Sequence, residues 1–196
     1  MPNTSNAELT KAELRAAALA RRDAIPPEER AAAAGAIAAH TFLYKLPNDL
    51  TVSGFMPMRS EINPLPLLRL FAEAGHPLAL PAIAGRGKPL IMRAYAFGDE
   101  LGRGQWGIRE PTPDKPEVEP DILIVPLAAF DRAGHRIGYG AGYYDMTINA
   151  LRAKKKVVAV GLAFAAQEIP RVPATERDER LDLVLTEREV IDFRGK

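Results

Sequence analysis

Residues 138–145 contain glycines at 138, 140 and 142, three tyrosines and Asp145, and glycines at this spacing can bind phosphate groups. The glycines permit positive φ, and they lack the side chains that would keep a bulky anion away from the backbone. A helix that starts directly after such a loop adds partial positive charge at its N-terminus. The spacing therefore indicates phosphate binding, with the acid suited to a bridging divalent cation. The alternative to a phosphate site is a flexible strand-to-helix turn with no ligand, because glycine spacing alone is weak evidence for phosphate binding.

Charged and aromatic side chains elsewhere could complete such a site. Lys11 and Arg15 are four residues apart, which places both cations on one helical face, although composition alone favours a solvated basic stripe. Glu61 is either an ordinary loop carboxylate or an anchor for a cationic or amide-bearing heterocycle. Trp106 is either a core residue or a stacking platform for a flat ring. Asp178 is compatible with a metal site and equally with an exposed turn.

Composition excludes several other kinds of chemistry. The chain has no cysteine, which rules out disulfides, thiolate metal sites and a cysteine nucleophile, and its three histidines share no metal-ligand spacing. Its 26 basic and 25 acidic residues give a net charge of +1, so no overall field indicates a nucleic-acid or membrane partner. No apolar run approaches the ~20 residues that span a bilayer, and the start lacks the apolar core of a signal peptide. We expect a cytoplasmic monomer with one domain over residues 1–196.

The elements that must position these residues can be predicted from periodicity. A capping box at Thr10 and Glu13 begins a helix that ends near residue 23, and Pro27 suits the start of a second that ends near residue 40. Further helices are expected over residues 63–75 and 143–153, and residues 97–120 are expected to form a long loop, which Trp106 and Ile108 indicate is packed on another part of the protein. The β-rich runs are residues 51–56, 77–81, 90–96, 122–126, 157–164 and, last, 183–185.

Strands that alternate with helices, several of them apolar on both faces, are typical of an α/β protein with a largely parallel sheet. We predict a three-layer α/β/α sandwich of the Rossmann-like type. In such sheets ligands bind beyond the carboxyl ends of the strands. The loops after Met56, after Pro81 and after Val125 all fall at that edge, so we expect them to converge on one site.

Residues 136–145, preceded by Val125-Pro126 and Phe130-Asp131, closely resemble the signature of the 5-formyltetrahydrofolate cyclo-ligase family, also called methenyltetrahydrofolate synthetases. The resemblance runs in order from Lys11 to Glu187. Its supporting pieces are residues 11–15, residues 55–57 with Glu61, residues 106–108 with 110–111, residues 162–164 with Gln167, and the tail at 178, 181–182 and 186–187.

This resemblance implies an enzyme that depends on ATP and Mg²⁺ and converts the small molecule 5-formyltetrahydrofolate to 5,10-methenyltetrahydrofolate. Phosphorylation of the formyl oxygen makes that oxygen a leaving group, the N10 nitrogen closes the ring, and ADP and phosphate are released. Two alternatives remain open: a non-catalytic paralogue that binds folate or nucleotide, and a related ATP-dependent enzyme that acts on another amide-bearing heterocycle.

The resemblance also implies roles for particular residues. Catalysis would rest on Lys11, Arg15 and Tyr143, and the pterin pocket on Met56, Glu61 and Trp106. Asp145 is the best candidate for a magnesium ligand, and Asp178 is a weaker candidate. The implied ATP site comprises Lys11, Arg15, Gly138, Tyr139, Gly140, Ala141, Gly142, Tyr143, Tyr144 and Asp145. Three positions depart from the family's usual residues: Ala141 replaces glycine or lysine, Met146 an arginine, and Ala82 a basic residue. These three departures are compatible with an altered substrate preference.

Overall fold

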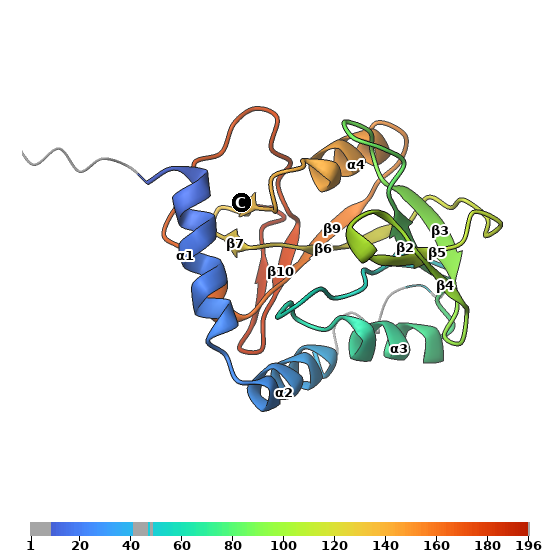
Figure 1. The fold of residues 1–196 in the computed structure, drawn as a ribbon, viewed down its shortest axis with the longest axis horizontal. Helices are drawn as coiled ribbons and strands as arrows, with labels where there is room; N and C mark the ends of the chain where they lie inside the picture. The colour runs from blue at the N-terminus through green and yellow to red at the C-terminus, as the bar shows by residue number, and fades with distance from the viewer. Residues whose placement is uncertain (1–8, 41–46, 48, 196) are drawn as a thin grey trace, which may run out of the picture.

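A seven-stranded sheet with the strand order β11-β10-β9-β6-β1-β2-β3 forms the centre of the molecule (Figure 1). The computed structural model describes residues 9–40, 47 and 49–195. The strands of this sheet are β1 (Val52–Ser53), β2 (Leu78–Ala82), β3 (Ile91–Tyr95), β6 (Ile122–Pro126), β9 (Val158–Leu162), β10 (Leu183–Leu185) and β11 (Val190–Asp192).

The five central strands run parallel, and only the edge strands β3 and β11 are antiparallel to their neighbours. Val52 of β1 aligns with Leu78 on one side and with Ile122 on the other, so the apolar runs lie in register. β6 is buried on both faces, as expected for a central parallel strand. The predicted α/β fold with a largely parallel sheet is confirmed.

Helices cover both faces of the sheet. α2 (Pro27–Ala38) and α3 (Leu65–Glu73) pack on one face, where Ile37 and Phe71 join the larger core. α4 (Tyr143–Arg152) covers the other face through Ile148 and Leu151. None of the helices in the described ranges is both long and apolar enough to cross a membrane.

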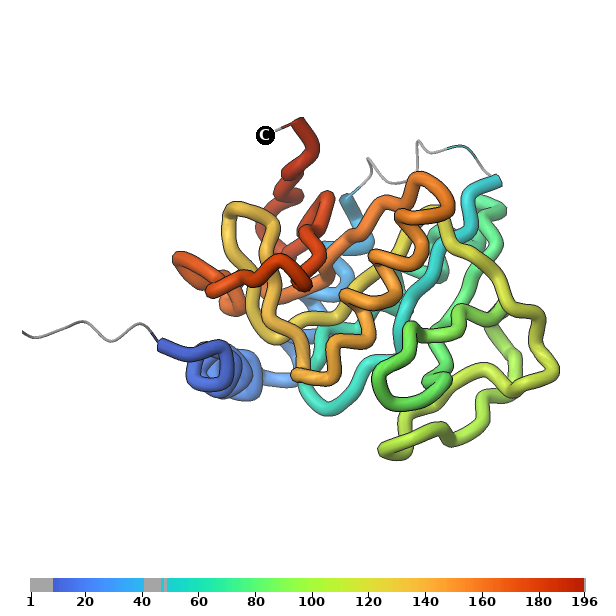
Figure 2. Tube along the Cα trace, turned by 90° about the horizontal axis from the view of Figure 1, so that it is seen from above, coloured from blue at the N-terminus to red at the C-terminus, as the bar shows by residue number. Residues whose placement is uncertain are grey.

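The first helix, α1 (Lys11–Asp23), lies beside the sheet and not on either face (Figures 1 and 2). Its predicted capping box is present, because Thr10 accepts from the N–H of Glu13 and the Glu13 side chain accepts from the N–H of Thr10. Its inner face packs on a small hairpin of β7 (Ala129–Phe130) and β8 (Arg136–Ile137). The loop that leads into α4 lies against α1, because Arg15 contacts the carbonyl of Gly138.

Three short β elements were not predicted. The expected loop over residues 97–120 contains the hairpin of β4 (Leu101–Arg103) and β5 (Arg109–Pro111), joined by the short 3-10 helix Gln105–Gly107. The β7–β8 hairpin precedes the glycine loop, and β11 follows the strand that was expected to be the last. These strands have two or three residues each, too few for an alternating pattern. Trp106 does not pack in a core: it is 69% exposed.

Gly54 offers a test of the packing at the carboxyl end of β1. A Cβ atom at this position would overlap the side chain of Leu68, which is fully buried in α3. We therefore expect Gly54→Ala to lower the free energy of unfolding by about 1–3 kcal/mol. Urea titration measures the effect. The matched control is Gly35→Ala in α2, where no atom lies within 4 Å of the added methyl, and it should stabilise by about 0.5–1 kcal/mol. Equal effects of the two changes would contradict this account.

Candidate functional site

Residues 138–142, the glycine loop, lead directly into α4 at the carboxyl edge of the sheet. Gly140 and Gly142 have φ of 99° and 70°, a conformation that favours glycine, whereas Gly138 does not need positive φ. Gly142 is the left-handed N-cap of α4, so the first turn of the helix opens onto the loop. Residues 139–142 are exposed. The loop is therefore open to an anionic ligand at the positive end of a helix.

One of the two predicted cations of α1 contacts this loop, and the other is paired with Asp178. Arg15 donates from Nε to the carbonyl of Gly138 at 2.7 Å, and its Nη2 lies 3.8 Å from where a Cβ on Gly140 would be. Lys11, one turn earlier, pairs through Nζ with Asp178 Oδ2 at 2.6 Å. Arg15 thus contacts the glycine loop and Lys11 is paired with an acid, so both cations of this stripe have protein partners.

The predicted acids Asp145 and Asp178 are joined by the segment around Glu179. Asp145 Oδ1 accepts from Arg136 Nη1 at 2.9 Å and from the backbone N–H of Glu179 at 3.0 Å. Asp178 Oδ2 accepts from Lys11 and from the N–H and hydroxyl of Thr175. Partial burial raises the pKa of Asp178, but the bonds from Lys11 and Thr175 outweigh it and hold that pKa below its usual value. The carboxylate is therefore charged at neutral pH.

These acids fit a magnesium ion that is held partly by a nucleotide. The described residues contain no cluster of three or more His, Cys, Asp or Glu side chains that could bind a metal alone. Mg²⁺, however, is commonly bound by one or two carboxylates together with substrate phosphates and water. All protein contacts recorded for Asp145 and Asp178 within the described ranges use one oxygen of each, Oδ1 and Oδ2 respectively. Each carboxylate therefore keeps one oxygen that could ligate an ion.

Arg22 is a site residue that was not predicted. It is 4% exposed, donates from Nε to Ser60 Oγ at 2.9 Å and from Nη1 to the hydroxyl of Tyr139 at 2.6 Å. It thereby links α1 to the loop after β1 and to the glycine loop. A signal was present in the sequence: Leu14, Ala18 and Arg22 recur every four residues, which places Arg22 on the inward face of α1.

Glu61 reaches the same network from the loop after β1. The Tyr139 hydroxyl donates to the Glu61 carboxylate, which also accepts from the N–H of Met58 at 2.8 Å. Burial raises the pKa of Glu61, and the contacts with Tyr139, Met58 and Arg22 only partly oppose that rise. Burial and the nearby charge of Glu61 raise the pKa of Tyr144 as well. The predicted convergence of the loops after β1 and after β6 is confirmed.

Trp106 faces the site from the tip of the β4–β5 hairpin. Its indole lies 6.2 Å from the Tyr143 ring, between ring centroids, at an interplanar angle of 54°. Its φ of 57° is uncommon for a residue with a side chain, and such strain is often kept for function. An exposed aromatic residue held in this way can stack on a flat ligand. Glu110 of the same hairpin accepts from the N–H of Ile83 at 3.2 Å and so joins the loop after β2.

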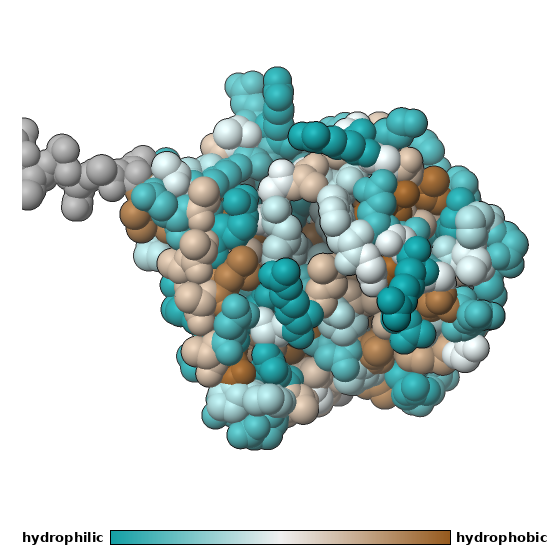
Figure 3. Space-filling model, in the orientation of Figure 1, coloured by the Kyte–Doolittle hydropathy of each residue, from teal (hydrophilic) through white to brown (hydrophobic). Residues whose placement is uncertain are grey.

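The face seen in Figure 3 mixes hydrophilic and hydrophobic residues and has no single broad hydrophobic area. A ligand on this face must therefore combine polar and apolar contacts. Among the departures noted above, Ala141 is exposed in the glycine loop, while Ala82 is 7% exposed at the end of β2.

The fold and this site together define a class: an α/β protein with an open glycine loop at the start of a helix, a cation in contact with that loop, a carboxylate joined to it through Tyr139, and an exposed aromatic side chain nearby. Residues 7–187 match the 5-formyltetrahydrofolate cyclo-ligase family. The chain belongs to this family, and the resemblance stated from its motifs is confirmed.

Individual relatives agree with this assignment. The chain is 32% identical to the 5-formyltetrahydrofolate cyclo-ligase of Mycolicibacterium smegmatis over 185 residues, which covers 90% of this chain and 93% of the relative. It is 32% identical to the Escherichia coli K12 enzyme of that name over 182 residues, covering 88% and 98%. The NMR structure of Aquifex aeolicus 5,10-methenyltetrahydrofolate synthetase superposes with a TM-score of 0.78 at 28% identity and covers 96% of this chain and 95% of that one.

Proposed function

We propose that this chain converts 5-formyltetrahydrofolate to 5,10-methenyltetrahydrofolate with consumption of ATP. The observation that carries the proposal is the set of contacts around the glycine loop: Arg15 donates to the carbonyl of Gly138, Lys11 of the same helix pairs with Asp178, and Glu61 reaches the loop through Tyr139. One end suits a polyphosphate and the other a hydrogen-bonding heterocycle. The proposal includes a cytoplasmic monomer that acts on a small molecule and not on nucleic acid or membrane.

The nucleotide end would work by positioning and charge. The phosphates would lie against residues 138–142 and the start of α4, with Lys11 and Arg15 as counter-charges. These cations act where negative charge develops as the terminal phosphoryl group leaves ADP. Asp145 and Asp178 would hold Mg²⁺, which when bound supplies charge neutralisation between phosphate oxygens.

The folate end would supply orientation. Glu61 would accept hydrogen bonds from pterin nitrogens, and Trp106 with Tyr143 would hold the flat ring next to the terminal phosphate. The formyl oxygen attacks phosphorus, and the bond between phosphorus and ADP breaks. N10 then attacks the activated carbon and loses its proton, and the carbon–oxygen bond breaks to release phosphate. The new carbon–nitrogen bond closes the ring.

The absorbance of methenyltetrahydrofolate tests the function directly. Purified protein with ATP, Mg²⁺ and 5-formyltetrahydrofolate should form the product and ADP in equal amounts. Neither product at high enzyme concentration would overturn the proposal. If ADP forms only with a different amide-bearing substrate, the enzyme carries out the same chemistry on another heterocycle.

Tyr139→Phe tests the link between the two ends through pH. The Tyr139 hydroxyl lowers the pKa of Glu61, so its removal should raise that pKa further above the usual value. Glu61 would then become protonated at a higher pH as the solution is acidified. We expect the KM for 5-formyltetrahydrofolate to begin rising at a higher pH in Tyr139→Phe than in the unmodified enzyme. KM measured from pH 5 to pH 8 gives the midpoint. Glu61→Gln should lack this transition, and an unshifted midpoint in Tyr139→Phe would contradict the role of Glu61.

A further inference from the structure

Arg22 is a buried cation on the inner face of α1. Its side chain is only 4% exposed, and a charge in such a place is kept only where hydrogen bonds replace the water that it loses. Nε donates to Ser60 Oγ at 2.9 Å, and Nη1 donates to the Tyr139 hydroxyl at 2.6 Å. Ser60 in turn donates to Asp23 at the end of the same helix. The partners of this buried charge therefore come from the loop after β1 and from the glycine loop.

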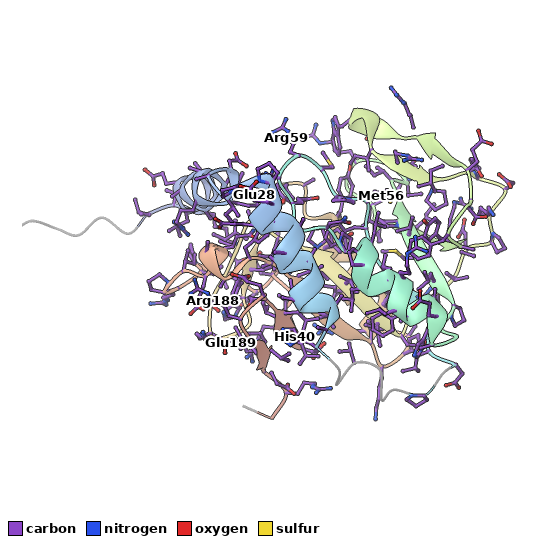
Figure 4. All side chains as sticks on the ribbon, turned by 90° about the horizontal axis from the view of Figure 1, so that it is seen from below. Glu28, His40, Met56, Arg59, Arg188 and Glu189 are labelled. Atoms are coloured by element: carbon purple, nitrogen blue, oxygen red, sulfur yellow. The ribbon has the colours of Figure 1, made fainter. Side chains whose placement is uncertain are left out.

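These contacts form a closed ring that runs through three segments of the chain. The Tyr139 hydroxyl accepts from Arg22 and donates to Glu61, and Glu61 directly follows Ser60 in the loop after β1. Figure 4 shows the preceding residue, Arg59, on this loop beside the end of α1. The position of the Glu61 carboxylate thus depends on α1 and on the glycine loop as well as on its own loop.

Arg22 contacts Tyr139 in two ways. Besides the hydrogen bond to the hydroxyl, the guanidinium lies 5.9 Å from the centroid of the Tyr139 ring. Tyr139 is 47% exposed, so packing restrains its ring only in part. A guanidinium holds two acceptors at once because its N–H groups point in fixed directions, whereas the ammonium of lysine is a point charge. Arg22 therefore sets the position of the hydroxyl that contacts Glu61.

The charge of Arg22 also acts on Glu61 itself. Burial raises the pKa of Glu61, and the Tyr139 hydroxyl, the N–H of Met58 and the charge of Arg22 oppose that rise. The phenol of Tyr144 in α4 is close to the same carboxylate, and burial raises its pKa, so it stays neutral. Arg22 therefore favours the charged form of Glu61, which accepts hydrogen bonds.

We propose that Arg22 is a positioning residue for the reaction: through the Tyr139 hydroxyl it fixes the Glu61 carboxylate relative to the glycine loop. This inference rests on the proposed function, in which Glu61 binds the folate and the glycine loop binds the nucleotide. Arg22 touches neither ligand. It keeps the two ends of the site at a constant separation, and transfer of a phosphoryl group from one ligand to the other depends on that geometry.

Arg22→Met tests the proposal in combination with Glu61→Gln. Methionine is also unbranched and fills much of the same space, but it removes both donors and the charge. We expect Arg22→Met to raise the KM for 5-formyltetrahydrofolate by about tenfold in the enzyme that retains Glu61. In the Glu61→Gln enzyme the same change should raise KM by less than about twofold, because Arg22 acts through the carboxylate. Equal effects in the two backgrounds would overturn the proposal, since Arg22 would then only stabilise the fold.

The pH dependence of KM is a readout that a purely structural role would not change. Loss of the Arg22 charge should raise the pKa of Glu61, so KM should begin to rise at a higher pH in Arg22→Met than in the unmodified enzyme as the solution is acidified. Arg22→Lys keeps the charge, so its midpoint should lie closer to that of the unmodified enzyme. An unshifted midpoint in Arg22→Met would contradict the proposal. If Arg22→Met does not fold, Arg22→Lys in the two backgrounds decides the question, because lysine cannot bind Ser60 and Tyr139 as arginine does.

Arg132→Gln is the control for loss of an arginine that joins distant segments. Arg132 pairs with Glu168 at 2.8 Å and with Glu189 at 2.7 Å, and none of these three residues belongs to the proposed site. Its replacement should leave the KM for 5-formyltetrahydrofolate and its pH dependence unchanged. A shift in Arg132→Gln equal to that in Arg22→Met would contradict a specific role of Arg22.

A binding measurement separates failure of this inference from failure of the proposed function. Calorimetry with 5-formyltetrahydrofolate in the absence of ATP gives the same comparison of backgrounds without turnover. Turnover in which Arg22→Met and Glu61→Gln act independently would overturn the positioning role and leave the function intact. Folate binding that depends on Arg22 only when Glu61 is present, without turnover, would support the positioning of Glu61 and overturn the function. Absence of both binding and turnover would overturn both.

Discussion

Lys11→Ala is expected to lower kcat/KM for ATP by about 10²- to 10³-fold, because in the proposed function Lys11 is a counter-charge to the transferring phosphoryl group. Lys11 is suited to this role by its place. It lies one helical turn from Arg15, which contacts the glycine loop, and its own ammonium pairs with Asp178, a proposed magnesium ligand. The dissociation constant for 5-formyltetrahydrofolate should change less than about twofold, because the folate contacts come from other loops. Steady-state kinetics with ATP varied, together with calorimetry for folate, measures the two effects.

The ion pair between Lys11 and Asp178 allows a structural explanation to be tested separately. If the only role of Lys11 were to hold α1 against the segment that contains Asp178, Lys11→Ala would weaken ATP binding and folate binding equally and would lower the melting temperature. Arg21→Ala is the matched control on the same helix. Arg21 donates from Nε to the carbonyl of Ala166, away from the glycine loop, and its loss should leave the KM for ATP unchanged.

The main frame of this protein could be predicted from its sequence because the signals were local and strong. The apolar run of residues 122–126 forms a central strand, and the capping box at Thr10 begins α1 where expected. The glycine spacing marked the loop before α4, and two of its three glycines adopt the positive φ that the spacing anticipated. Each of these features depends on a few neighbouring residues, which is why pattern and structure agree.

The contacts between distant segments could not be predicted in the same way. The spacing of Lys11 and Arg15 would be the same in a helix whose basic face is solvated and in a helix that packs beside a loop. The loop that Arg15 contacts is more than a hundred residues away in the sequence. The helix α1 packs on the β7–β8 hairpin, whose two-residue strands leave no pattern, and on the 3-10 helix Ala165–Gln167, and these contacts hold it against the glycine loop. The partnership of Arg22 with Tyr139 is of the same kind. The sequence contains both residues, but nothing in it pairs them.

Asp145→Asn should raise the Mg²⁺ concentration for half-maximal activity by roughly tenfold and lower kcat by about 10- to 100-fold, because an amide is a weaker magnesium ligand than a carboxylate. Asp145 also pairs with Arg136, which is 5% exposed, so the same change should cost about 1–3 kcal/mol of stability. The loss stays moderate because the amide oxygen can still accept from Arg136 and from the N–H of Glu179. Initial rates against Mg²⁺ at saturating ATP and folate measure the first effect, and urea titration measures the second.

Glu179→Gln separates the metal role of Asp145 from its structural role. Glu179 pairs with Arg152 at 2.7 Å and accepts from Asn149 at 2.9 Å, so its replacement disturbs the same segment without removing a proposed magnesium ligand. Partial burial raises the pKa of Glu179, but these contacts outweigh it and hold that pKa below its usual value. The carboxylate is therefore charged at neutral pH, and removing its charge should have a measurable effect on stability. We expect Glu179→Gln to lower the melting temperature and to leave the magnesium dependence unchanged. If both variants shifted the magnesium dependence in proportion to their loss of stability, Asp145 would be a structural partner of Arg136 and the ion would have to bind elsewhere.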